Sequence, residues 1–211
     1  MTIVAARSVS GFFGEVVEDS IRQRKVDATD GATAYLVALL ADFARPDRRA
    51  GETLERSLTL LFDEAINTPN AADRFDRLRC LGDGVLYGCG FFGDHFEARG
   101  VDAKYLHGLG TRAYDAASHI LQARAPVEPR GHRPGSAPLR DDLFAELAQK
   151  FEAFVNIVAD VADTTIAMGT ETSRGLLKVY ERWLKTGSNR LATALTSRGV
   201  VPTRGPRGIV Q

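Results

Sequence analysis

Five glycines lie within a helical pattern of apolar residues between Leu81 and Phe96, at positions 82, 84, 88, 90 and 93. A glycine in a helix interior costs about 1 kcal/mol relative to alanine, so five cost on the order of 5 kcal/mol. That cost is comparable to the net stability of a small domain. Our first hypothesis is that close packing of another helix against the glycines offsets this free-energy cost. A dimer face and a ligand that needs close backbone approach are the alternatives.

One side of this segment gathers Gly84, Tyr87, Gly88, Phe91 and His95, which are the candidate ligand or interface residues. The opposite side is apolar as well, so the helix has two apolar sides. Such a helix is central in a bundle or packs against another subunit. The spacing of Gly84 and Gly88, four residues apart, would let a second helix approach the backbone closely.

Two residues are candidates for binding a metal ion, Asp115 and His119. They are four residues apart and share a helix face. Carboxylate-bridged metal bundles need a Glu-x-x-His sequence on several helices, and this chain has none. Surface or capping roles are the favoured interpretation of the histidines. Haem ligation by a single histidine stays open, and the cofactor is unknown.

Signatures of nucleophilic and phosphate chemistry are absent from the sequence. It has no Gly-x-Ser-x-Gly, no Gly-rich phosphate loop with Lys-Ser/Thr, and no dinucleotide fingerprint after a strand. Cys80 and Cys89 would point about 180° apart on one helix, so they cannot pair with each other. The acids at 152, 160 and 163 fall opposite an apolar stripe, where a solvated face is expected. The sequence therefore favours a protein that is not an enzyme.

Charge is balanced overall but uneven along the chain. The sequence has 27 basic and 27 acidic residues. Residues 1–181 contain 21 of the basic residues and all 27 acidic ones, which gives a net charge of −6. The remaining six basic residues follow this segment. Arg198, Arg204 and Arg207 lie near or in a Pro/Gly-rich end and are the candidates for contact with a polyanion. Because no global positive field exists, nucleic acid is a disfavoured partner.

Proline placement and apolar spacing indicate helices throughout, since interior proline breaks a helix. Segments are expected at about 10–24, 30–45, 54–66, 70–99, 102–121, 143–161 and 176–195, the last with a possible break at Gly187-Ser188. Thr29 and Asp30 are expected to cap the second segment. The sequence predicts an all-α, single-domain bundle of about six to seven mostly antiparallel helices with a Pro/Gly loop near 126–138.

We expect a helical domain over 1–198, with a possible division into 1–125 and 139–198, and a flexible basic tail over 199–211. The longest uncharged runs, Gly31–Ala41 and Gly84–Gly93, are about half the ~20 residues of a membrane span. No secretory signal is evident, and two cysteines form no disulfide framework, so a cytoplasmic protein is predicted.

The leading functional hypothesis is a non-enzymatic helical protein that acts through protein–protein contacts, as a homodimer. The alternative is a bundle that binds an apolar small molecule or cofactor beside the helix over 70–99, with enzymatic activity left open. Fatty acid, haem and metal all remain within that alternative.

Overall fold

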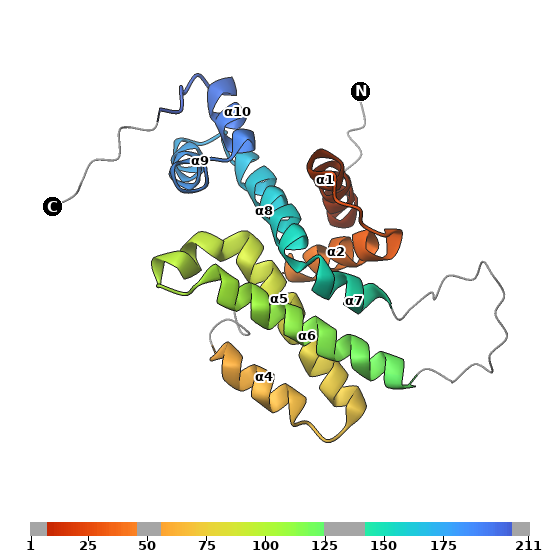
Figure 1. Cartoon of the computed structure of the whole chain (residues 1–211). Helices are drawn as coiled ribbons and strands as arrows, with labels where there is room; N and C mark the ends of the chain where they lie inside the picture. The colour runs from red at the N-terminus through yellow and green to blue at the C-terminus, as the bar shows by residue number, and fades with distance from the viewer. Residues whose placement is uncertain (1–7, 46–55, 125–141, 204–211) are drawn as a thin grey trace. The chain divides into compact units, whose positions relative to one another are not determined.

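The computed structural model describes residues 8–45, 56–124 and 142–203 of the chain. Across these ranges it consists of α-helices without a β-strand (Figure 1). The helices are α1 (Val9–Arg24), α2 (Asp30–Phe43), α4 (Leu58–Ile66), α5 (Ala71–Ala98), α6 (Ala103–Arg124), α7 (Asp142–Gln149), α8 (Phe151–Ala167), α9 (Ser173–Thr186) and α10 (Asn189–Ser197). The predicted all-α fold is confirmed.

Capping residues explain where several helices begin and end. The hydroxyl of Thr29 accepts a hydrogen bond from the Ala32 amide at 3.1 Å and begins α2, as predicted. Asn70 begins α5 in the same way, through the amides of Ala72 and Asp73. Gly187 ends α9 with φ 67°, a left-handed conformation that glycine adopts without strain. The predicted break at Gly187-Ser188 is therefore present, and it separates α9 from α10.

The single helix expected over 143–161 is instead divided into α7 and α8 at Lys150. Backbone hydrogen bonds continue across the division, from the Lys150 amide to the Glu146 carbonyl and from the Phe154 amide to the Lys150 carbonyl. Because the apolar spacing also continues, the sequence pattern alone indicates one helix here. The predicted loop at 126–138 lies outside the described residues.

The contacts within the chain divide it into two units, Met1–Val158 and Ala159–Gln211, and the division falls inside α8. Each unit has its own buried side chains. The predicted domain limits, 1–198 and a tail over 199–211, stay a prediction.

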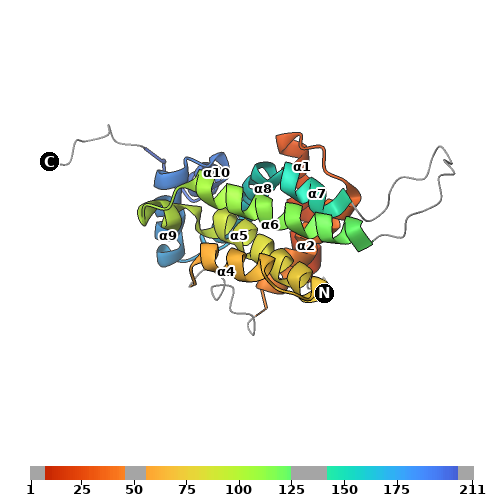
Figure 2. The same ribbon diagram turned by 60° about the horizontal axis from the view of Figure 1, so that its bottom comes forward.

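In the first unit, α5 and α6 form the most extensive helix pair, joined by the short connection from Arg99 to Asp102. They lie side by side with α4 in Figures 1 and 2. The ring of Phe144 on α7 contacts Tyr35 of α2, Phe75 of α5 and Tyr114 of α6, with centroids 5.2–6.0 Å apart. Phe144 thus joins α7 to three helices of this unit.

Close approach explains two glycines of this unit. A Cβ at Gly82 would lie 2.6 Å from a ring carbon of the fully buried Tyr114. A Cβ at Gly110 on α6 would lie 2.1 Å from the ring of Phe151. Gly93, by contrast, has nothing within 4 Å of that position. The packing hypothesis therefore accounts for Gly82 and does not account for Gly93.

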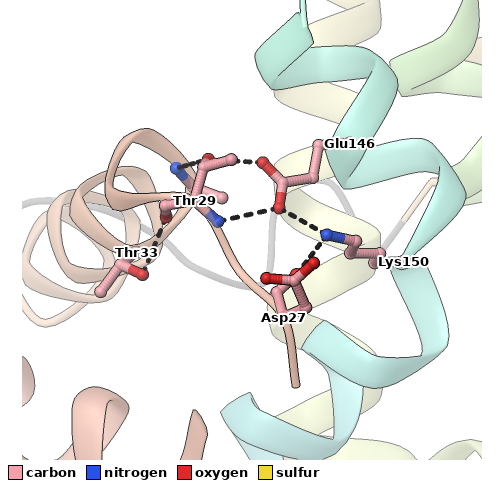
Figure 3. A network of polar contacts seen from close by, with 6 residues as sticks. Asp27, Thr29, Thr33, Glu146 and Lys150 are labelled. Atoms are coloured by element: carbon pink, nitrogen blue, oxygen red, sulfur yellow. Dashed lines mark hydrogen bonds and ion pairs between the residues drawn. The ribbon is translucent and has the colours of Figure 1, made fainter.

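A polar network joins α7 to the start of α2 (Figure 3). The Glu146 carboxylate accepts hydrogen bonds from the Thr29 amide (3.0 Å), the Thr29 hydroxyl (2.5 Å) and the Lys150 ammonium (3.0 Å). Lys150 also donates to the backbone carbonyl of Asp27. An acid 117 residues away in sequence thereby helps to cap α2, so the register of α7 against α2 is fixed by charge as well as by packing.

The second unit packs α9 and α10 with the end of α8 around Val179, Trp183, Leu191 and Leu195. A Cβ at Gly175 would lie 1.8 Å from the Gly169 carbonyl oxygen, so the start of α9 lies directly against the preceding turn.

Candidate functional site

A groove of about 550 Å³ lies between α1 and α2 in the first unit. Its lining residues are Ser10, Gly14 and Glu18 of α1 and Asp30, Thr33, Ala34, Val37 and Ala38 of α2. Most of these side chains are small, and a Cβ at Gly14 would meet nothing within 4 Å. Ala34 and Ala38 are exposed. The groove is thus open to a large side chain or a helix from outside.

Helix α2 is apolar on both its inner and its outer side. Ala32, Leu36, Leu39 and Leu40 are buried, while the outer side carries no charge between Asp30 and Asp42. A helix that is apolar all round is normally covered on every side. The sequence signal for this feature is the uncharged run Gly31–Ala41, which is too short for a membrane span but covers most of α2. None of the helices in the described ranges is long and apolar enough to cross a membrane.

The five candidate residues on α5 do not form one surface. Gly84 and Gly88 are buried, Tyr87 and Phe91 are half-buried, and His95 is exposed. The backbone leaves helical geometry at Phe92, with φ −126° and ψ 19°, between Phe91 and His95. The role of these residues in binding a ligand or a partner stays a prediction.

An aromatic stack covers part of this side of α5 from within the same chain. The rings of Phe43 at the end of α2 and Tyr87 are stacked with centroids 4.3 Å apart, and Tyr87 stacks on Phe91 at 4.5 Å. Phe92 lies beside them and is 42 % exposed. The end of α2 therefore covers part of the side of α5 for which a second subunit or a ligand is a hypothesis from the sequence.

A buried carboxylate that the sequence analysis did not single out lies between α2, α5 and α6. Asp83, 8 % exposed, accepts hydrogen bonds from the hydroxyls of Tyr35 (2.6 Å) and Tyr114 (2.8 Å) through Oδ1. Its Oδ2 accepts from the Arg79 guanidinium at 3.0 Å. The cluster joins three helices, and three of the four acceptor positions of the carboxylate are used.

Burial dominates the electrostatics of this cluster. Loss of solvent raises the pKa of Asp83, against the hydrogen bonds from Tyr35 and Tyr114 and the charge of Arg79, which lower it. Burial and the neighbouring Asp83 charge raise the pKa of Tyr35 and Tyr114 above the usual value for tyrosine. Both phenols therefore stay protonated and act as hydrogen-bond donors to the acid.

A second cavity, of about 440 Å³, is lined by Arg79, Asp83 and Tyr35 together with residues from the start of α1 and the last turns of α2. Apolar side chains such as Leu39 and Phe43 share its wall with these polar groups. An apolar wall with a few convergent polar groups is the usual form of a small-molecule site. A sequence signal for Asp83 did exist, since it is the one charged residue between Arg79 and Asp94.

The metal candidates Asp115 and His119 are both exposed on α6, with 3.5 Å between the His119 Nε2 and an Asp115 carboxylate oxygen. In the described part of the chain, no three or more His, Cys, Asp or Glu side chains come together as a metal site would require. The pair is thus a surface acid–histidine contact, and its role in metal binding stays a prediction.

Of the three polyanion candidates, Arg198 is exposed and its Nε donates to the hydroxyl of Thr170 at 3.3 Å. Arg204 and Arg207 lie outside the described residues. Contact of these arginines with a polyanion stays a prediction.

The prediction that the acids at 152–163 lie on a solvated face is wrong for the C-terminal half of this segment. Asp163 is buried and accepts a hydrogen bond from Arg182 of α9 at 2.6 Å. Asp160 is 4.0 Å from Arg190, which also donates to Thr164. Because arginines of α9 and α10 neutralise these acids, α8 can bury a side that looks polar in sequence.

Comparison of the chain with models of protein families, with curated proteins and with solved structures finds no match.

Proposed function

We propose that this protein acts through protein–protein contacts and forms a homodimer through the groove between α1 and α2. The supporting observation is the exposed, uncharged outer side of α2, with Ala34 and Ala38 at its centre. Burial of apolar surface is the main favourable term in protein association. Small side chains also let an incoming helix approach closely.

Substitution of Ala38 by glutamate tests the proposal. A charge at the centre of the interface would be buried without a partner, whereas in a monomer it would be solvated. We expect Ala38→Glu to give a monomer with unchanged helical content, measured by light scattering and circular dichroism. Ala72→Glu, at an exposed position in the first turn of α5, is the control and should remain dimeric.

Two results would contradict the proposed interface. One is an Ala38→Glu protein that stays dimeric. The other is a Phe91→Glu protein that becomes monomeric while Ala38→Glu does not, because that pattern would place the interface on α5, as the sequence analysis suggested.

The second candidate function is binding of a small molecule in the cavity beside Asp83. It is favoured by one observation, the buried carboxylate with an acceptor position to spare on the cavity wall. If it is correct, native mass spectrometry of the purified protein finds a retained small molecule, and Asp83→Asn lowers its occupancy more than tenfold. A wild-type protein without added mass, or equal occupancy in the variant, would rule out this role for Asp83.

A further inference from the structure

The groove between α1 and α2 has an acidic rim. Among the described residues that line it, Glu18 and Asp30 are the charged ones and none is basic. Both acids are exposed. An occupant with an apolar centre and positive flanks would match this groove in both polarity and charge.

The outer side of α9 has these properties. Leu177 is 56 % exposed and Leu184 is 43 % exposed, and their positions seven residues apart place them on one side of the helix. The same side carries the exposed residues Arg174, Lys178, Glu181 and Lys185, a net charge of +2. The inner side of α9 is fully engaged, since Val179 and Trp183 belong to the core of the second unit.

The groove and the helix also agree in length. Seven residues of helix separate Leu177 from Leu184, a rise of about 10.5 Å. The groove is lined along α1 from Ser10 to Glu18, a rise of about 12 Å. Two leucines two turns apart can therefore lie within one groove.

We propose that the groove of one copy receives the outer side of α9 from a second copy, with Leu177 and Leu184 lying along the groove that Ala34 and Ala38 help to line. This inference rests on the proposed dimer and names the segment that fills its groove. In the proposed dimer each copy supplies one groove and one α9, so that the contact is made twice about a two-fold axis.

Helix α4 is a poorer occupant, although Leu60 is 61 % exposed and Ile66 is 41 % exposed. Its exposed acid Asp63 has the same sign as the rim of the groove, and the nearby Glu64 is already paired with Arg56 at 2.8 Å. Like charges brought together at an interface disfavour the pairing.

Disulfide cross-linking between two differently tagged copies tests the inference. In a background that lacks both native cysteines (Cys80→Ser, Cys89→Ala), one copy carries Ala34→Cys and the other Lys178→Cys, which leaves both leucines in place. On mild oxidation of the mixed full-length chains, we expect the mixed disulfide to form at least tenfold faster than with Lys104→Cys, an exposed lysine of α6.

The outcomes separate the inference from the proposed function. A dimer that forms no faster cross-link at Lys178 than at Lys104 overturns the inference and leaves the proposed dimer standing, with another occupant in the groove. A chain that carries both Ala34→Cys and Lys178→Cys tests for contact within one copy. If its disulfide forms at a rate that does not change on dilution, α9 reaches the groove of its own chain, and the inference is overturned. A wild-type chain that is monomeric overturns both.

Charge reversal supplies a second readout that does not depend on cysteine. Glu18→Lys and Lys178→Glu should each weaken the dimer by about fivefold, as expected when two symmetric rim ion pairs worth about 0.5 kcal/mol each are lost. The double variant should recover much of the wild-type affinity. If the double variant lost as much binding free energy as the two single variants added together, this result would contradict a contact between the two helices.

Discussion

At the scale of single residues, the buried glycines and polar groups of the first unit have different roles. Gly82 lies against the ring of Tyr114, and the hydroxyl of that tyrosine is bound to Asp83. The ring therefore cannot move without loss of a buried hydrogen bond. Gly93 lies eleven residues further along the same helix with open space around it.

These surroundings predict opposite effects of the same substitution. Overpacking at Gly82 costs about 1–3 kcal/mol, and the better helix propensity of alanine returns about 1 kcal/mol. Gly82→Ala should therefore lower the free energy of unfolding, by about 1 kcal/mol, whereas Gly93→Ala should raise it by up to about 1 kcal/mol. Urea denaturation of both variants measures the difference, and an equal change in both would contradict the packing explanation.

The sequence indicates that the glycine-rich segment is important but not which glycine is in close contact. A helical wheel ranks faces by polarity, while close approach depends on which ring lies opposite, and Tyr114 comes from another helix. Asp83 was missed for a related reason. Its partners Tyr35 and Tyr114 are 48 and 31 residues away in sequence, so no local pattern brings them together.

At the scale of helices, the start of α2 depends on an acid from α7. Glu146 is 8 % exposed and binds both the amide and the hydroxyl of Thr29. Burial raises the pKa of Glu146, but the hydrogen bonds from Thr29 and the ion pair with Lys150 outweigh it, so the pKa is lowered overall. A lowered pKa in the folded state means that the ionised carboxylate stabilises the fold.

The sign of the pH dependence follows from this shift. The contribution of Glu146 is complete above the pKa of an unfolded glutamate, about 4.5, and is lost as the pH falls from there through the lower folded pKa. At pH 7, Glu146→Gln should lower the free energy of unfolding by about 1.5–3 kcal/mol, the usual range for hydrogen bonds to a charged group.

Unfolding measured from pH 7 to pH 3 checks this prediction. The difference between wild type and Glu146→Gln should shrink below about pH 4.5. Glu152→Gln, at an exposed position of α8, is the control and should have a small effect. A Glu146→Gln difference that is constant over this range would show that the carboxylate charge does not contribute.

Helix positions and caps could be predicted well, because proline placement, apolar spacing and residues such as Thr29 act locally. Contacts between residues far apart in the sequence could not be predicted. The Glu146–Thr29 contact and the pairing of Asp163 with Arg182 both join segments that are adjacent only after folding. The solvated face expected around Asp163 was wrong for that reason, since an arginine from α9 neutralises the acid.

At the scale of the whole molecule, the proposed function depends on whether two copies associate. The outer side of α2 leaves small apolar residues exposed beside a groove, and α9 exposes two leucines between basic residues. Both surfaces are apolar at their centres and opposite in charge at their edges. The proposed dimer would cover both of them in each copy.

The subunit number of the full chain at micromolar concentration is the most direct test of this account. Light scattering on the wild type and on Ala38→Glu gives it without a label or a ligand. We predict the mass of two chains for the wild type and of one chain for the variant. A wild-type protein with the mass of one chain throughout that range would contradict it.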